Sequence, residues 1–575
     1  MNPDALLPVV MQLDVRVPMR DGVELSVDLF LPDAPRGTLS TWPAILQRTP
    51  YDNARRLYPK FHWVEVARYF AAHGYVFVSQ DVRGRGDSDG VWHPFMNEAE
   101  DGYDTVEWIA RQPWSSGRVG MMGGSYGGLV QWLAAREGPP HLTTLVSTAA
   151  AGRLMEELPY RHGKLRPPWA MWWLNMVAGR TVQPPELIEW PRVIRTRPAK
   201  DVDLAVGRRN TVWREWLAHP TLDDYWRQMG MLNRFAQLDL PVMHITGWFD
   251  GDQLGQLYYW REMAVHSPAR DRQFLLAGPW DHAGTRAPEP RFGGLEFGDA
   301  AMLDMNAIHL RWFDYWLKGR GAAPTDFARG CRSRIFLMGE NRWRDDPTWP
   351  PPAAVGERWC FRSGGRANTV SGDGRLEPAP PPEGEPPDRY TYDPDAPTPS
   401  SEPPDVYPPA EVRLDERWLL GREDVLVYTS EALAQPMEVT GHPLVVLEAA
   451  TDAPDTDFAA TLYDVFPDGR SMALCDGIVR ASYRNDSGRP ESSPLAPGRP
   501  YTYRIELVAI SNVFLPGHRV RVAVMSARWP AYDRNPNTGA PPGDDAVARP
   551  AAQVVLHEHG RASHLLIPVV PRGTA

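Results

Sequence analysis

The run 123–128 reads Gly-Gly-Ser-Tyr-Gly-Gly and sets Ser125 in a Gly-x-Ser-x-Gly motif. The segment before it, 118–122, is short and apolar, and the segment after it, 129–135, combines good helix formers with apolar residues at helical spacing. A strand, a sharp turn and a helix in this order hold a serine hydroxyl exposed, beside the backbone N–H groups of the helix start. Glycines flank such a turn because a Cβ would collide with the neighbouring strand and helix. A glycine-rich loop without chemistry is the alternative, but the flanking strand and helix favour a nucleophile.

Apolar strands alternate with helices on both sides of this motif. We predict strands at 43–47, 75–79, 142–147, 241–246 and 273–277, and helices at 58–73, 97–112 and 301–318. Continuous apolar strands alternating with helices indicate a mainly parallel sheet covered on both faces. Two alternating strands within 12–31, joined by a turn at 20–22, precede the sheet.

The alternation stops twice, which divides the chain of 575 residues into parts. Residues 151–238 are predicted to be a helical, tryptophan-rich insertion between the two parts of the α/β unit, 1–150 and 239–330. From 331 to 575, short alternating segments separated by turn residues favour a β-sandwich or jelly roll. Within that part, the stretch 364–410 is rich in Pro, Gly, Ser and Asp and is predicted to be irregular.

Composition excludes several classes of function. The formal net charge is −11 and no long basic run is present, so nucleic acid is not an expected partner. No apolar run is long enough to span a bilayer, and the N-terminus lacks the pattern of a signal peptide, so a cytoplasmic location is expected. Cys331, Cys360 and Cys475 are far apart, which predicts reduced, buried thiols rather than disulfides or a metal site. Composition leaves open whether the chain forms a homo-oligomer.

A serine nucleophile needs a histidine base and a carboxylate that orients it. On an open α/β sheet these groups follow the carboxyl ends of later strands, the acid before the histidine. Asp250 follows the predicted strand 241–246, and His282 lies in the loop after 273–277. Asp252 and Asp281 are rival acids, which we interpret as solvated loop residues.

The oxyanion of the tetrahedral intermediate needs hydrogen-bond donors. One is expected to be the backbone N–H of Tyr126, directly after the serine. The loop 47–52 has no glycine run to offer backbone donors, but Tyr51 could offer its phenol O–H, which stays protonated at neutral pH. By spacing alone, a packed core tyrosine is an equal alternative for Tyr51.

Several motifs, taken in order, resemble those of the CocE/NonD group of serine hydrolases. This group includes cocaine esterases, X-Pro dipeptidyl-peptidases, α-amino acid ester hydrolases and some cephalosporin acylases. The matching segments are 48–51, 80–86, 123–128, 247–250, 278–282, 526–530 and 533–539. The resemblance runs nearly from end to end.

The resemblance implies an α/β-hydrolase fold with an inserted helical cap and a C-terminal jelly roll of the galactose-binding type. It implies a triad of Ser125, Asp250 and His282, and it assigns Tyr51 as the side-chain donor to the oxyanion. The chain departs from the pattern at 251–253, where at most a fragment remains of the carboxylate cluster that holds a substrate ammonium in the α-amino acid ester hydrolases.

We therefore predict a serine hydrolase that cleaves carboxylic esters through an acyl-enzyme, with amides as a further substrate class. The reaction is expected to need no metal or cofactor. Two alternatives use the same triad, an X-Pro dipeptidyl-peptidase and a β-lactam acylase; a third is a non-catalytic protein that binds a ligand. Four aromatic residues are hypothetical walls of the substrate pocket, with packing inside the insertion as the alternative: Trp169, Trp172, Trp173 and Phe249.

Overall fold

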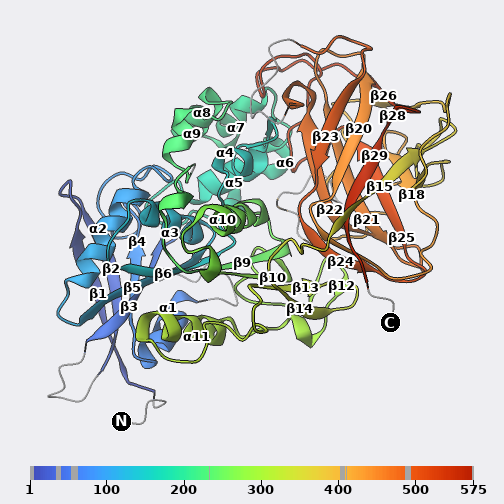
Figure 1. Ribbon diagram of the computed structural model, residues 1–575. Helices are drawn as coiled ribbons and strands as arrows, with labels where there is room; N and C mark the ends of the chain where they lie inside the picture. The colour runs from blue at the N-terminus through green and yellow to red at the C-terminus, as the bar shows by residue number, and fades with distance from the viewer. Residues whose placement is uncertain are drawn as a thin grey trace.

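The computed structural model describes residues 6–33, 41–53, 62–231, 233–401, 408, 411–485 and 494–572. Figure 1 shows an N-terminal α/β part beside a C-terminal part built from strands, with a group of short helices above the α/β part. The two large sheets belong to these two parts, and no strand is shared between them in the described ranges.

A mixed sheet of ten strands forms the centre of the α/β part, counted over the described residues. Its central strands run parallel: β3 (Trp42–Thr49), β4 (Val76–Asp81), β5 (Ser115–Gly124), β6 (Leu142–Thr148), β9 (Val242–Phe249) and β10 (Gln273–Asp281). The edges are completed by β1 (Val9–Pro18), β2 (Glu24–Pro32), β13 (Ser333–Leu337) and β14 (Arg342–Asp346). The order is β1-β2-β4-β3-β5-β6-β9-β10-β13-β14, and β1, β2 and β14 pair antiparallel. Each strand predicted in this part is present, and the predicted hairpin is β1–β2.

Helices cover both faces of this sheet. One face packs on α2 (Glu98–Ala110), α3 (Tyr126–Arg136) and α10 (Gln253–His266). The other packs on α1 (Trp63–Ala72) and α11 (Met305–Lys318). The helix predicted at 58–73 corresponds to α1, and the predicted positions 58–61 lie outside the described residues. The parallel strands are buried between two apolar layers, which explains their continuous apolar sequences.

The segment between β6 and β9 is made of short helices around a tryptophan-rich core. Its elements are α4 (Leu154–Glu157), β7 (Tyr160–Arg161), β8 (Lys164–Leu165), α5 (Pro167–Met176), α6 (Trp190–Val193), α7 (Val202–Val206), α8 (Thr211–Ala218) and α9 (Asp224–Gln228). Aromatic rings hold these helices together: Trp173 stacks on Trp216 with 6.3 Å between ring centroids, and Trp216 contacts Trp226 at 6.1 Å. Figure 1 places these helices between the central sheet and the C-terminal strands.

The C-terminal part is one connected sheet of 13 strands in the described residues, and its strands surround one large apolar core. The strands are β15 (Val355–Arg362), β16 (Arg375–Glu377), β17 (Asp388–Tyr392), β18 (Leu426–Thr429), β19 (Met437–Gly441), β20 (Leu444–Thr451), β21 (Asp457–Val465), β22 (Ser471–Arg480), β23 (Tyr501–Glu506), β24 (Ile510–Phe514), β25 (Arg519–Met525), β26 (Ala551–Val555) and β29 (His564–Val570). Short strands thus follow one another without intervening α-helices, as the alternating pattern predicted. A second, smaller apolar cluster packs on β18, β21, β22 and β25.

One expectation for this part is wrong in detail. The stretch 364–410 contains two strands, β16 and β17, although it was predicted to be irregular; its positions 402–407, 409 and 410 lie outside the described residues. β17 pairs with β26 and buries Asp388, Tyr390 and Tyr392 on one face. This alternation of buried and exposed residues in β17 is difficult to recognise in the sequence, because one buried position holds a carboxylate and the strand follows a stretch rich in proline and glycine.

The three cysteines are unbonded. Cys360 and Cys475 are buried, whereas Cys331 is only half-buried, contrary to the expectation for all three. The described helices include none whose length and apolar character would let it traverse a bilayer.

Candidate active site

Ser125 lies in the sharp turn between β5 and α3, with φ 61° and ψ −126°. A positive φ is unfavourable for a residue with a Cβ, so the surrounding contacts must hold this conformation. The Ser125 N–H donates to the carbonyl of Thr148 at 3.0 Å. A Cβ on Gly123 would lie 2.7 Å from the carbonyl oxygen of Gly127, and one on Gly128 would lie 2.8 Å from that of Thr148. The glycines are therefore required by close backbone approach, as the motif predicted.

His282 follows β10 and Asp250 follows the neighbouring strand β9, so the two side chains meet at the same edge of the sheet. The Nδ1 nitrogen of His282 lies 2.7 Å from Asp250 Oδ1. The Asp250 carboxylate is buried and also accepts from the Thr246 hydroxyl at 3.1 Å and the Asp252 N–H at 3.0 Å. Because an ionised carboxylate only accepts hydrogen bonds, Nδ1 carries the proton and Nε2 remains an acceptor.

Burial is the largest single influence on the pKa of His282 and lowers it. The charge and hydrogen bond of Asp250, together with the charge of Asp252, outweigh burial, so the pKa of His282 is raised overall. The His282 side chain is 31% exposed, whereas that of Asp250 is fully covered. The imidazole can therefore be reached from the cavity while its partner cannot.

A cavity of about 360 Å³ brings the predicted residues together. Ser125 and His282 line it, together with Tyr51 and Tyr126. In the part of the chain that the structure describes, no hydrogen bond joins the Ser125 hydroxyl to His282. In structures without substrate such contacts are often long and tighten only in the reacting complex.

The two tyrosines have different surroundings. The indole N–H of Trp173 donates to the phenol oxygen of Tyr51 at 3.0 Å, so the Tyr51 O–H proton points away from the indole. The phenol of Tyr126 donates to Glu98 Oε1 at 2.7 Å and accepts from the Phe95 N–H at 3.2 Å. Burial raises the pKa of Tyr126 well above its usual value. Tyr126 therefore offers the cavity its backbone N–H at the first position of α3, while its phenol anchors α3 to α2.

Three of the four predicted wall residues line the cavity and one does not. Trp169, Trp172 and Trp173, all on α5, are part of its wall. Phe249 packs against Phe292, with 5.0 Å between ring centroids, and is not part of the lining. Phe249 is the last residue of β9, and its ring also packs on Phe297 at 6.4 Å. The structure therefore does not place Phe249 in the wall of this cavity.

The two rival acids also differ from the expectation. Asp252 lines the cavity with a side chain only 16% exposed, 3.9 Å from His282 Nδ1, and burial raises the pKa of Asp252 to about 6. It is not a solvated loop residue. Asp281 is half-buried and its Oδ1 accepts from the Gly284 N–H at 2.7 Å, which stabilises the turn after β10.

Two arginines that sequence analysis did not select belong to this site. Arg85 is buried and donates to the carbonyl of Pro50 at 2.7 Å and to that of Val177 at 2.8 Å. It thereby ties the loop that carries Tyr51 to the residue that follows α5. Arg166 lines the cavity, with its guanidinium 5.2 Å from the Trp169 ring centroid. The matching segment 80–86 was the available signal for Arg85, whereas nothing local distinguishes Arg166.

The described residues contain no group of three or more His, Cys, Asp or Glu side chains arranged to hold a metal ion. The chemistry that the site itself offers is a hydroxyl, an imidazole with a buried carboxylate, and hydrogen-bond donors around one cavity.

Comparisons with known proteins found two matching family models. Residues 21–284 match the family model of X-Pro dipeptidyl-peptidase (S15 family), and residues 326–566 match that of the X-Pro dipeptidyl-peptidase C-terminal non-catalytic domain. The chain is 33% identical to the cocaine esterase of Rhodococcus sp. (strain MB1 Bresler), an alignment that covers 97% of this chain and 98% of that protein.

Two solved structures are similar over nearly the whole chain. An aminopeptidase from a marine sediment archaeon, Thaumarchaeota archaeon, has 28% identity and a TM-score of 0.86, covering 99% of this chain and 98% of that one. An α-amino acid ester hydrolase has 27% identity and a TM-score of 0.85, covering 98% and 96%.

Proposed function

We propose that this chain, which belongs to the CocE/NonD family of hydrolases, cleaves carboxylic esters through an acyl-enzyme formed on Ser125. The chain has the paired S15 and C-terminal domains of the X-Pro dipeptidyl-peptidases. One observation carries the proposal: the imidazole of His282, held by the buried Asp250 carboxylate at 2.7 Å, faces the cavity that Ser125 also lines.

The proposed reaction has two halves. The Ser125 oxygen attacks the ester carbonyl and its proton passes to His282 Nε2; the tetrahedral intermediate then collapses, and the leaving alcohol takes that proton. Water next attacks the acyl-enzyme with the same imidazole as base, releasing the acid and restoring the serine. Asp250 fixes the tautomer of the imidazole and stabilises its charged form. These steps use only residues of the chain and water.

The oxyanion is proposed to be held by the Tyr51 phenol and the Tyr126 N–H. The hydrogen bond from Trp173 to the Tyr51 oxygen supports this role because it occupies that oxygen as an acceptor and directs the phenol proton elsewhere. Each such donor contributes about 3–4 kcal/mol to the stability of the transition state.

We also propose that the short helices of 151–238 act as a cap that shapes the acyl pocket, and that 331–575 is a jelly roll. The contribution of α5 to the cavity lining supports the first proposal, and the β strands around one large apolar core support the second.

A second candidate is hydrolysis of substrates with a free α-amino group, as the name of the ester hydrolase relative suggests. Asp252 favours it, since a carboxylate in the cavity could pair with an ammonium. Burial raises the pKa of Asp252 to about 6, although the charge of Arg166, which lines the same cavity, acts in the opposite direction. A guanidinium that already faces this carboxyl competes with a substrate ammonium, which supports neutral esters over amino esters or X-Pro peptides.

The proposal is tested with p-nitrophenyl esters and a fluorophosphonate probe. The unmodified protein should hydrolyse the esters and take up one label, and Ser125→Ala should do neither. Ser116→Ala, at an exposed position of the same strand, is the matched control and should behave as the unmodified protein. Retained hydrolysis by Ser125→Ala would reject the mechanism. Faster turnover of X-Pro-anilides or β-lactam amides than of aryl esters would instead favour a peptidase or an acylase.

A further inference from the structure

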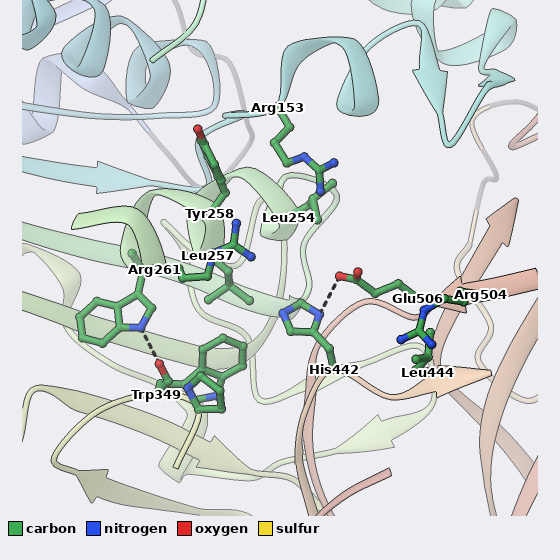
Figure 2. Close-up of a pocket in the computed structure, with 12 residues that line it drawn as sticks. Arg153, Leu254, Leu257, Tyr258, Arg261, Trp349, His442, Leu444, Arg504 and Glu506 are labelled. Atoms are coloured by element: carbon green, nitrogen blue, oxygen red, sulfur yellow. Dashed lines mark hydrogen bonds and ion pairs between the residues drawn. The ribbon is translucent and has the colours of Figure 1, made fainter. Parts of the chain in front are cut away.

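A second cavity, of about 370 Å³, lies between α10 and the strands β20 and β23 of the C-terminal part (Figure 2). It shares no lining residue with the cavity that contains Ser125. Its lining comes from both parts of the molecule: Arg153, Leu254, Leu257, Tyr258, Trp260, Arg261, Trp349, Pro350, His442, Leu444, Arg504 and Glu506. The proposed hydrolysis assigns no role to any of these residues.

Three guanidinium groups surround this cavity, from Arg153, Arg261 and Arg504, and Figure 2 shows them on different sides of it. Arg261 is partly neutralised by Glu262, whose Oε1 lies 3.0 Å from its Nη2. Within the described ranges, the guanidinium groups of Arg153 and Arg504 have neither a hydrogen bond nor an ion pair.

The other titratable groups of the cavity offset only part of this charge. Glu506 is the single carboxylate of the lining, and it is directed to His442, with 3.6 Å between Oε1 and Nδ1. Burial lowers the pKa of His442, so its ring is neutral near pH 7. The lining therefore keeps an excess of positive charge.

The rest of the lining is apolar. Leu254 and Leu257 of α10 and Leu444 of β20 contribute aliphatic surface, and Trp260 and Trp349 contribute indole surface. Apolar walls with a few convergent polar groups are typical of small-molecule sites.

We propose that this cavity binds an amphipathic organic anion, with a carboxylate or phosphate head between Arg153 and Arg504 and an apolar chain against the leucines and indoles. Guanidinium groups pair with both kinds of head through two parallel hydrogen bonds. An inorganic anion would leave the apolar wall unused, and a neutral lipid would leave the arginines unpaired. Because Arg153 precedes α4 and Arg504 lies on β23, a bound anion would bridge the helical segment 151–238 and the C-terminal part.

The test is calorimetric titration of the full-length protein with octanoate, octyl phosphate, inorganic phosphate and octanol. One or both octyl anions should bind, and comparison of the two identifies the preferred head group. Inorganic phosphate and octanol should each bind at least about tenfold more weakly, since each lacks one half of the recognition. Equal binding of octanol and the octyl anions, or binding of neither anion at millimolar concentration, would overturn the proposal.

Variants test whether the anion binds in this cavity. The double variant Arg153→Gln/Arg504→Gln should weaken binding of the octyl anion about tenfold or more, because charge-assisted hydrogen bonds are lost. Arg389→Gln, at an exposed position of β17 outside the cavity, is the matched control and should bind as the unmodified protein. Trp172→Ala, in the wall of the Ser125 cavity, should also leave this binding unchanged, which separates it from occupation of the proposed active site.

A loss of folding is distinguished from a loss of the site by the thermal transition. Without ligand the double variant should unfold at the temperature of the Arg389→Gln control, and the octyl anion should raise that temperature only in the control. The single variant Arg504→Gln, at an exposed strand position, gives a second measurement if the double variant is unstable. Equal affinity in the arginine variants and the control, or loss of binding in Trp172→Ala alone, would contradict the assignment.

Discussion

The strand ends of the central sheet and the short helices above them build the Ser125 cavity by different means. At the strand ends, Ser125, Asp250 and His282 follow parallel strands whose register is set by backbone hydrogen bonds, as between Gly247 and Gly278. In the helical segment, Trp169 and Trp172 project from a helix that is held mainly by aromatic packing. The difference teaches that backbone pairing positions the reactive groups, while side-chain packing shapes the space around them. Variants of the first region should therefore change kcat, and variants of the second should change KM.

The largest effect is expected at the strand ends, from Asp250→Asn. An amide at this position donates to the imidazole and favours the wrong tautomer, so kcat should fall about 10⁴-fold while KM changes little. Steady-state kinetics with a p-nitrophenyl ester measures both constants. Asp281→Asn, which alters a neighbouring acid in the turn after β10, is the control and should retain most activity. Equal losses in the two variants would mean that Asp250 acts only through the local fold.

Tyr51→Phe should lower kcat about 10²–10³-fold, because one donor to the oxyanion is lost while the ring still fills its site. Tyr126→Phe keeps the backbone donor, but it leaves the buried Glu98 carboxylate without one hydrogen bond. That change should cost about 1–3 kcal/mol of unfolding free energy and leave kcat of the folded protein nearly unchanged. Kinetics together with chemical denaturation separates the two tyrosines, and the reverse pattern would exchange their roles.

A smaller effect is expected in the helical segment. Trp172→Ala should raise KM for an aryl ester about tenfold, with kcat within about twofold, because the side chain contributes apolar wall but no reacting group. Trp190→Ala, in the core of the same segment but not in the lining, is the control: it should lower the unfolding temperature without raising KM. A large loss of kcat in Trp172→Ala would break the proposed division between the two regions.

The smallest effect is expected where the two regions meet, at Asp252. The pKa of His282 is raised, and the charge of Asp252 contributes to that increase. The neutral imidazole is the base, so activity should be lost as the pH falls through this raised value. Asp252→Asn removes the negative charge 3.9 Å from Nδ1, so the acidic limb of the kcat/KM profile should move to lower pH. A shift to higher pH would contradict the assigned electrostatics, and Asp281→Asn again serves as the control.

Sequence patterns predicted more about the sheet than about the cavity wall. The apolar strands, the turn at Ser125 and the order of Asp250 and His282 are local features, and the described structure contains each predicted strand of the central sheet. Phe249 is next to Asp250 in the sequence, but its ring packs on Phe292 and is not part of the cavity wall. The sequence favours interpreting Asp252 as a solvated loop acid, because its neighbours in the chain do not reveal that its side chain is buried.

Local pattern and chain order are enough to predict positions for a nucleophile, a base and an acid, because a strand–turn–helix motif and the ends of parallel strands can be recognised within short segments. Which tryptophans face the cavity, and how Arg85 links the Tyr51 loop to the end of α5, depends on the tertiary structure. It alone brought Arg153 and Arg504 to one cavity. The physical reason is that these contacts join segments far apart in the chain, and their geometry depends on side-chain packing that no single segment encodes.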